Sequence, residues 1–140
     1  MNAYEAGKAI YQQWMSAWPS ASGGIAFVFD NDVVDETSLY ARVAIHSITS
    51  EQHTLGPVGS RKWLRAGFIM VTLKGPSNQG RKSADVLTSA VKSTLEGVRL
   101  AASGTEEGVF TFAASVDEQP PDGQFWILAI RVPFQYYETR

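Results

Sequence analysis

The chain has 140 residues and a net charge of −2, a length that predicts one domain, residues 1–140, able to bury a core unaided. The slightly acidic balance argues against a general nucleic-acid binder, and the absence of cysteine excludes disulfides, thiol catalysis and cysteine-ligated metals. No apolar run reaches the ~20 residues that span a bilayer, and Glu5 and Lys8 interrupt the N-terminal segment, so we expect no membrane span, no signal peptide and a cytoplasmic location.

Residues 3–18 have the apolar spacing of an amphipathic helix. Asn2 can cap its start, and Pro19 is expected to end it, because the residue before a proline avoids the helical region. Trp14 and Trp18 lie one turn apart on the same helix face. Two interpretations stay open for them: both pack onto a sheet, or one of them anchors a partner subunit.

A short strand is predicted at residues 25–29, followed by an acidic turn that contains Asp30, Asp32 and Asp35. We compared this turn with a calcium-binding loop. It lacks the central glycine and the distal bidentate glutamate that such loops use. We therefore interpret it as a solvated acidic loop.

Residues 37–48 alternate between apolar and polar side chains, which predicts a strand with one covered face. His46 lies on the polar face and His53 lies in the connection that follows, so we expect no metal site. That connection, residues 49–61, contains two glycines and a proline and is longer than a hairpin needs. We predict an exposed hairpin tip or arm that touches a partner, with an idle surface loop as the alternative.

Residues 62–74 form a long predicted strand, and both of its faces are apolar in the second half, so it is expected at the centre of the sheet. Gly67 in its middle indicates a β-bulge or the close approach of another backbone. Arg65 within this run requires a carboxylate or carbonyl partner, either from its own chain or from a neighbouring subunit.

The turn after this strand, GPSNQGRKS at residues 75–83, invites comparison with a phosphate-binding loop. That motif needs a glycine, four residues, a second glycine, and then lysine and serine or threonine at once. Here Arg81 separates Gly80 from Lys82, and in the other alignment Pro76, which has no N–H group, takes the place of a glycine. We therefore expect no nucleotide site.

A second helix is predicted over residues 80–97, and residues 98–100 can add a short strand. Two alternating runs, 109–116 and 124–137, are joined by an acidic, proline-containing turn that is typical of an antiparallel hairpin. Pro133 cannot donate a ladder hydrogen bond, so we expect this end of the chain at a sheet edge. The predicted order is α-β-β-β-α-β-β, an α+β fold with two helices and a mostly antiparallel sheet of about four or five strands.

Nothing in the sequence predicts catalysis. There is no nucleophile-elbow GxSxG, and the adjacent carboxylates lie in turns, where they are expected to be solvated. We therefore expect a protein that is not an enzyme and has no cofactor or metal. The many aromatic residues, the long arm and the closing run with Tyr136 and Tyr137 favour assembly with other chains.

Taken together, these elements resemble the tail terminator proteins of long-tailed bacteriophages over nearly the whole chain. The shared arrangement is an N-terminal helix, a small-residue linker, a W-x-R-x-G strand, a Pro- and Gly-containing turn that opens the second helix, and a closing aromatic and acidic cluster. The residues that carry it are Trp63, Arg65, Gly67, Pro76, Asn78, Gly80 and the cluster VPFQYYE at 132–138.

This resemblance implies a structural virion protein without a cofactor. Terminators form a hexameric ring that caps the tail tube, ends its polymerisation and provides the surface for head attachment. The implied partners are further copies of the chain, the tail tube protein and a head–tail connector or stopper protein, while DNA passes through the lumen without specific binding. The implied location is the phage tail of the virion, after assembly in the host cytoplasm.

The candidate residues for these roles lie in the arm, the closing strand and the acidic turn. We expect contacts with a neighbouring subunit or the tube at Glu51, Gln52, His53, Thr54, Leu55, Arg65, Tyr136 and Tyr137. We expect the lumen, where like charge keeps DNA from sticking, to be faced by Asp30, Asp32 and Asp35. The alternative function is another head–tail joining component, a stopper or a minor tail protein, also without enzymatic activity.

Overall fold

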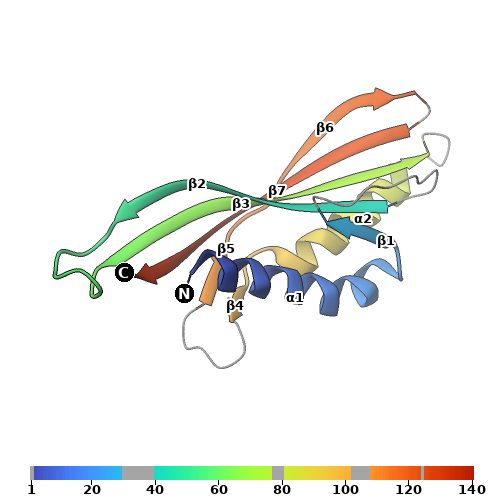
Figure 1. Cartoon of the computed structure of the whole chain (residues 1–140). Helices are drawn as coiled ribbons and strands as arrows, with labels where there is room; N and C mark the ends of the chain where they lie inside the picture. The colour runs from blue at the N-terminus through green and yellow to red at the C-terminus, as the bar shows by residue number, and fades with distance from the viewer. Residues whose placement is uncertain (1, 30–39, 77–80, 102–107, 124) are drawn as a thin grey trace.

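The computed structural model describes residues 2–29, 40–76, 81–101, 108–123 and 125–140. Figure 1 shows one twisted sheet with both helices on the same face. The elements in chain order are α1 (Ala3–Ser22), β1 (Ala26–Phe29), β2 (Tyr40–Gln52), β3 (Lys62–Pro76), α2 (Arg81–Leu95), β4 (Arg99–Ala101), β5 (Gly108–Thr111), β6 (Ser115–Asp122) and β7 (Phe125–Thr139). The predicted α+β class is confirmed.

The sheet has the strand order β1-β2-β3-β7-β5-β4, and β6 also pairs with β7. β1 and β2 are parallel, whereas the other described pairs are antiparallel. The described strands number seven, more than the four or five expected. The difference arises because the run at 109–116 divides into β5 and β6, and because the three-residue β4 pairs with β5.

Helix α1 starts as predicted and ends later. The Asn2 side chain accepts a hydrogen bond from the Glu5 backbone N–H at 2.9 Å, and the Glu5 carboxylate accepts one from the Asn2 N–H at 2.8 Å, which is a capping box. The prediction that Pro19 ends the helix is wrong. Proline has a helical φ, so in the last turn its main cost is one missing N–H donor, and the helix continues to Gly23, which adopts a left-handed φ of 76°.

The two tryptophans of α1 belong to the core. Trp14 and Trp18 are both fully buried, and their rings stack with centroids 4.3 Å apart. The Trp18 indole N–H donates to the Ile25 carbonyl at 2.9 Å, which ties the helix to the segment that leads into β1. The interpretation in which one of these residues anchors a partner subunit is therefore wrong, since neither ring reaches the surface.

The core lies between the helices and the middle of the sheet. The strand register places apolar residues of β2, β3 and β7 in three successive rows on the helix side. These rows are Ala41–Leu73–Leu128, Val43–Val71–Ile130 and Ile45–Ile69–Val132. The predicted apolar stripe of α2 is buried against these rows, as its periodic spacing requires. Its buried residues are Ala84, Leu87, Ala90, Val91, Thr94 and Leu95. β3 is central, as predicted, because it pairs with β2 on one side and β7 on the other.

Gly67 sits where two backbones come unusually close. A Cβ atom at this position would overlap the carbonyl oxygen of His46 on β2. The register between β2 and β3 shifts directly beside it, between Ser47 and Thr49, which marks a β-bulge. Both features expected from a glycine in mid-strand are therefore present, and the bulge lies where the sheet continues beyond the helices (Figure 1).

The prediction that this end of the chain lies at a sheet edge holds for residues 136–139, which pair only with β3 among the described strands, but it is wrong for Pro133 itself. Pro133 pairs with Phe68 of β3, and its carbonyl accepts a hydrogen bond from the Phe112 N–H at 2.9 Å on the other side. In a strand, the N–H and C=O groups of one residue point the same way, so the missing donor of Pro133 faces residues 112–114, between β5 and β6. The proline is tolerated inside the sheet because the neighbouring ladder is interrupted at that point.

Candidate functional site

Beyond the bulge, β2, β3 and the end of β7 extend past the helices as a narrow ribbon, seen at the left of Figure 1. We call this ribbon the arm and define it as residues 49–67 and 135–140. β1 pairs only with residues 40–43 of β2, and β5 reaches only Gln135 of β7. Within the described part of the chain, both long edges of the arm therefore lack a strand neighbour, a condition under which sheets can pair with another chain.

The connection predicted as a 13-residue loop is shorter. β2 continues to Gln52, so Glu51 and Gln52 are strand residues, and only residues 53–61 join the two strands. Sequence reasoning missed this extension because Thr49 to Gln52 has no apolar alternation. Cross-strand pairing with β3 holds these polar residues in place. The prediction of an exposed hairpin tip is confirmed, while its contact with a partner stays a prediction.

The tip is held in a defined shape by its own hydrogen bonds. The N–H groups of His53 and Thr54 donate to the Lys62 carbonyl at 2.8 and 3.2 Å, and the Lys62 N–H donates to the Thr54 hydroxyl at 2.8 Å. Arg61 Nε donates to the Gly56 carbonyl at 2.7 Å. The tip nevertheless presents two apolar side chains to solvent, since Leu55 is 93% and Val58 is 84% exposed.

Arg65 finds its partner within its own chain. Its Nε lies 2.8 Å from Oε2 of Glu138, and the two side chains are only 21% and 17% exposed. The guanidinium also stands over the ring of Trp63, with 5.3 Å between Cζ and the ring centroid. These residues converge because Arg65 pairs with Tyr136, and Trp63 with Glu138, in neighbouring rows of the β3–β7 ladder.

We expect a double-mutant cycle on Arg65 and Glu138 to give a coupling free energy of roughly 1 kcal/mol, because the pair is hydrogen-bonded and mostly removed from solvent. Arg65→Met, Glu138→Gln and the double variant would be compared by urea unfolding. Lys92→Met is the matched control, since Lys92 is an exposed base on α2 far from the arm. Purely additive effects would mean that the ion pair contributes nothing to stability.

Tyr136 lies opposite Arg65 in the β3–β7 ladder and is only 4% exposed. Burial raises the pKa of its phenol above the ordinary value of 10.0, and the Glu138 carboxylate raises the pKa further, whereas Arg65 lowers it. The folded chain therefore holds the phenolic proton more tightly than the unfolded chain does.

This shift predicts a loss of stability at alkaline pH. Below pH 10 the phenol is protonated in both states, and above pH 10 the unfolded state loses its proton first, so the free energy of unfolding falls as pH rises. Tyr136→Phe should flatten that fall when chemical denaturation is measured from pH 8 to pH 11. The difference between the two proteins isolates Tyr136 from other groups that titrate there, and identical slopes would refute this assignment.

The remaining candidate residues are distributed over the arm. His53 and Tyr137 pack with ring centroids 5.3 Å apart, and Glu51 and Tyr137 flank Leu64 in one row. The structure thus brings the contact candidates from two distant parts of the sequence into one ribbon. The three candidate lumen residues, Asp30, Asp32 and Asp35, lie outside the described residues.

Three further residues of the arm were not among the sequence candidates. Trp63 and Glu138 complete the cluster around Arg65. Val58 lies in the tip, with 84% of its surface exposed. The need of Arg65 for a carboxylate or carbonyl partner was visible in the sequence, but nothing in the sequence singled out Glu138 as that partner. No signal in the sequence singles out Val58, since exposure of a loop valine depends on how the loop is folded.

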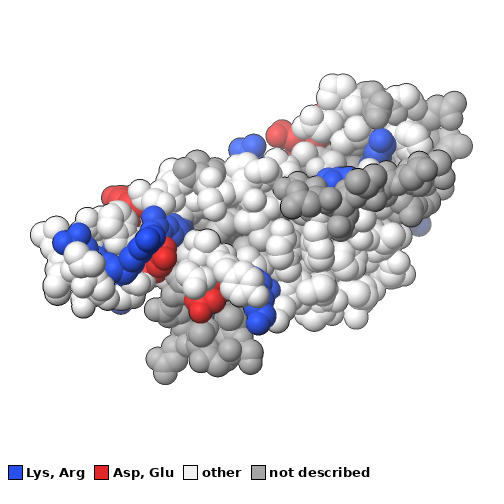
Figure 2. Space-filling model, in the orientation of Figure 1, with Lys and Arg blue, Asp and Glu red and all other residues white. Residues whose placement is uncertain are grey.

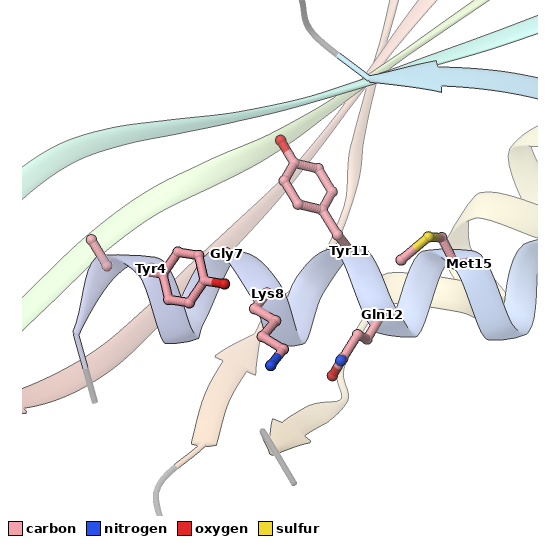
Figure 3. A pocket seen from close by; sticks show the side chains of 7 residues that line it. Tyr4, Gly7, Lys8, Tyr11, Gln12 and Met15 are labelled. Atoms are coloured by element: carbon pink, nitrogen blue, oxygen red, sulfur yellow. The ribbon is translucent and has the colours of Figure 1, made fainter.

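A shallow depression of about 510 Å³ lies along the outer side of α1 (Figure 3). Its lining is mostly apolar and consists of Ala3, Tyr4, Gly7, Lys8, Tyr11, Gln12 and Met15. In Figure 3, Tyr11 points toward the strands, and its ring contacts Phe29 at 4.5 Å between centroids. The lining includes no histidine or carboxylate. Among the described residues, no group of three histidine, aspartate or glutamate side chains is placed to hold a metal ion, and no helix could span a membrane.

No protein-family model and no curated protein sequence matches the chain. A solved structure whose title gives no function has the same fold with a TM-score of 0.73 at 11% identity, covering 97% of this chain and 96% of that one. A second similar chain belongs to a structure titled the virion of a native gene transfer agent particle. Its TM-score is 0.68 at 14% identity, and the match covers 98% of this chain and 100% of that chain. At such identities the likeness shows a shared fold, which here extends over both chains almost end to end.

Proposed function

We propose that this chain is a structural protein of a phage-like virion and that it acts there as a tail terminator. The observation that carries the proposal is the end-to-end likeness in fold to a chain of a gene transfer agent virion. The finer role draws on the family resemblance, whose W-x-R-x-G strand and closing cluster meet in one place through the contacts of Arg65 with Trp63 and Glu138.

In this role, copies of the chain form a hexameric ring that caps the tail tube, ends tube polymerisation and offers a surface to the head–tail connector or stopper protein. The arm contacts the tube or the neighbouring subunit through its open edges and its exposed tip. DNA passes through the lumen without specific binding, and Asp30, Asp32 and Asp35 face it. The protein resides in the virion after assembly in the host cytoplasm, and it has no catalytic role and no cofactor.

The decisive experiment is electron microscopy of the purified chain mixed with purified tail tubes. A terminator should form rings that cap tube ends, and tubes grown in its presence should stop at a defined length. Removing the protein from the assembling particle separates the candidate roles. Overlong tubes indicate a terminator, whereas tails of normal length that remain unattached to heads indicate a stopper or another joining component.

Replacing residues 54–61 with an Asn-Gly turn tests the arm within this function. The Gln52–Trp63 pairing can be kept, because a two-residue turn matches the twist of the flanking strands. We expect the shortened protein to fold and to lose capping of tubes. Lys92→Glu, a change of one exposed helical side chain, serves as the control that should cap normally. Unchanged capping by the shortened protein would assign the arm no part in it.

A further inference from the structure

The β2 edge of the arm exposes backbone hydrogen-bonding groups at alternate residues. The His53 N–H donates to the Lys62 carbonyl at 2.8 Å, and the β2–β3 register continues from this pair without a shift through the arm. In an antiparallel ladder every second residue bonds to the same neighbour. Glu51 therefore bonds to β3, whereas the N–H and C=O groups of Ser50 and Gln52 point away from it. β1 ends before the bulge, so no described strand lies beside these two residues.

The β7 edge of the arm has the same backbone pattern but is less accessible. The Arg140 N–H donates to the Arg61 carbonyl at 2.7 Å, so the outward groups of this edge belong to Tyr137 and Thr139. The side chains of Tyr137 and its two chain neighbours are buried or half-buried, whereas those of residues 49–52 are all exposed. The β2 edge is therefore the one that an incoming chain can reach more easily.

The other outer strands of the sheet carry features that hinder pairing with a further chain. β1 and β4 are only four and three residues long, and β6 contains two prolines and three acidic residues. Short strands, prolines and charges are common means by which proteins protect sheet edges. In β2, residues 49–52 read TSEQ, without a proline or a lysine. The β-bulge lies before these residues and leaves their register with β3 regular.

Charge does not select a partner for the arm. Lys62 and Arg140 are exposed bases, whereas Glu51 is an exposed acid on the same ribbon. Arg65 and Glu138 neutralise each other. Figure 2 shows side chains of both signs on the arm, at the left. The backbone groups are then the most regular feature of the β2 edge, and an extended chain is the structure that complements them.

We propose that the β2 edge of the arm binds an extended segment of the tail tube protein by strand addition, through the outward N–H and C=O groups of Ser50 and Gln52. The incoming segment carries a basic or hydroxyl side chain beside Glu51, because opposite charges and hydrogen-bonding pairs across strands are favourable. A second copy fits less well, since full overlap of two such edges places Glu51 opposite Glu51. The inference rests on the proposed function, because it names how the arm contacts the tube.

Proline substitutions at the two outward residues test this main-chain contact. Ser50→Pro and Gln52→Pro each remove one outward N–H group and leave the ladder with β3 intact. Ser50→Ala and Gln52→Ala remove the same side chains and keep the N–H groups. In co-sedimentation with purified tail tubes, each proline variant should therefore bind roughly tenfold more weakly than the alanine variant at the same position.

A proline on the opposite edge is the control. Thr139→Pro also removes an outward N–H group, but from the β7 edge, so it should not show this loss. Urea unfolding checks that each proline variant is folded. Equal binding by the proline and alanine variants, or an equal loss in Thr139→Pro, would overturn the proposal. Self-association of the unchanged chain that Ser50→Pro removes would assign the edge to a second copy and overturn it as well.

Amide hydrogen exchange tests the same contact without any substitution. In the free chain the amides of Ser50 and Gln52 should exchange freely, whereas the Glu51 amide is protected by its bond to β3. On tubes the two outward amides should become protected too. Exchange that stays fast on tubes contradicts strand addition, whichever variants fold.

Failure of the contact and failure of the proposed function give different results. Capping by Ser50→Pro and Gln52→Pro as efficient as that of the unchanged chain removes the contact and keeps the terminator role. Tubes that bind the chain with protected Ser50 and Gln52 amides, but grow without a defined length, keep the contact and remove that role. A chain that does not bind tubes at all overturns both.

Discussion

Gly67→Ala is expected to lower the free energy of unfolding by roughly 3 kcal/mol, at the upper end of the cost of overpacking. The added methyl group would overlap the His46 carbonyl oxygen and lie 3.0 Å from the ring of Phe134. The obstructing atom is backbone within the β2–β3 ladder, so relief requires the two strands to separate at the bulge. Urea unfolding followed by far-ultraviolet circular dichroism measures the loss.

Gly7→Ala is the matched control for this prediction. Gly7 lies inside α1, where an added Cβ would meet only the Ile45 side chain, at an ordinary distance of 3.9 Å. Alanine favours the helix over glycine, so this variant should be more stable by about 0.5–1 kcal/mol. The same chemical change is thus expected to have opposite signs at the two positions. Equal effects would contradict the backbone contact at Gly67.

Trp14→Ala is expected to lower the free energy of unfolding by about 4 kcal/mol, because it removes a fully buried ring and leaves a cavity that the sheet cannot fill. Trp14 stacks on Trp18 and also packs edge-on against Phe27 at 6.1 Å between ring centroids. The thermal midpoint should fall by roughly 10 °C. A loss below ~1 kcal/mol would mean that the helix repacks without this ring.

Phenylalanine substitutions refine the same prediction. The Trp18 indole N–H is hydrogen-bonded to the Ile25 carbonyl, whereas the buried Trp14 N–H has no partner among the described residues. Trp18→Phe should therefore cost about 1 kcal/mol more than Trp14→Phe, since only the former strands an acceptor. Calorimetric unfolding of the two proteins side by side measures this difference, and the reverse order would contradict it.

The features of the arm show how much of the candidate site can be predicted from the sequence. A glycine in mid-strand was enough to predict a bulge or the close approach of another backbone, because only a residue without a Cβ tolerates such an approach. The demand of Arg65 for a carboxylate was equally readable. Its partner was not, because Glu138 lies 73 positions away and comes near only through the β3–β7 register.

Proline positions were misread for a related reason. Pro19 and Pro133 each lack a donor, and a local rule places such residues at the end of a helix or at the edge of a sheet. Whether a missing donor matters depends on what lies opposite it. Residues 112–114 lie opposite Pro133 and belong to no strand, so no ladder hydrogen bond is lost there. The sequence around Pro133 does not show this, because the interruption lies in another segment of the chain.

By itself, the sequence determined the fold class, the helix–strand order, the apolar faces of the helices and strands, and the central place of β3. These follow from side-chain periodicity, which is a local property of helices and strands. Only the tertiary structure decided that the arm is a three-stranded ribbon with open edges and that Arg65 is satisfied within its own chain. Those features arise from pairing between distant segments, and strand register is set by the contacts of the whole sheet.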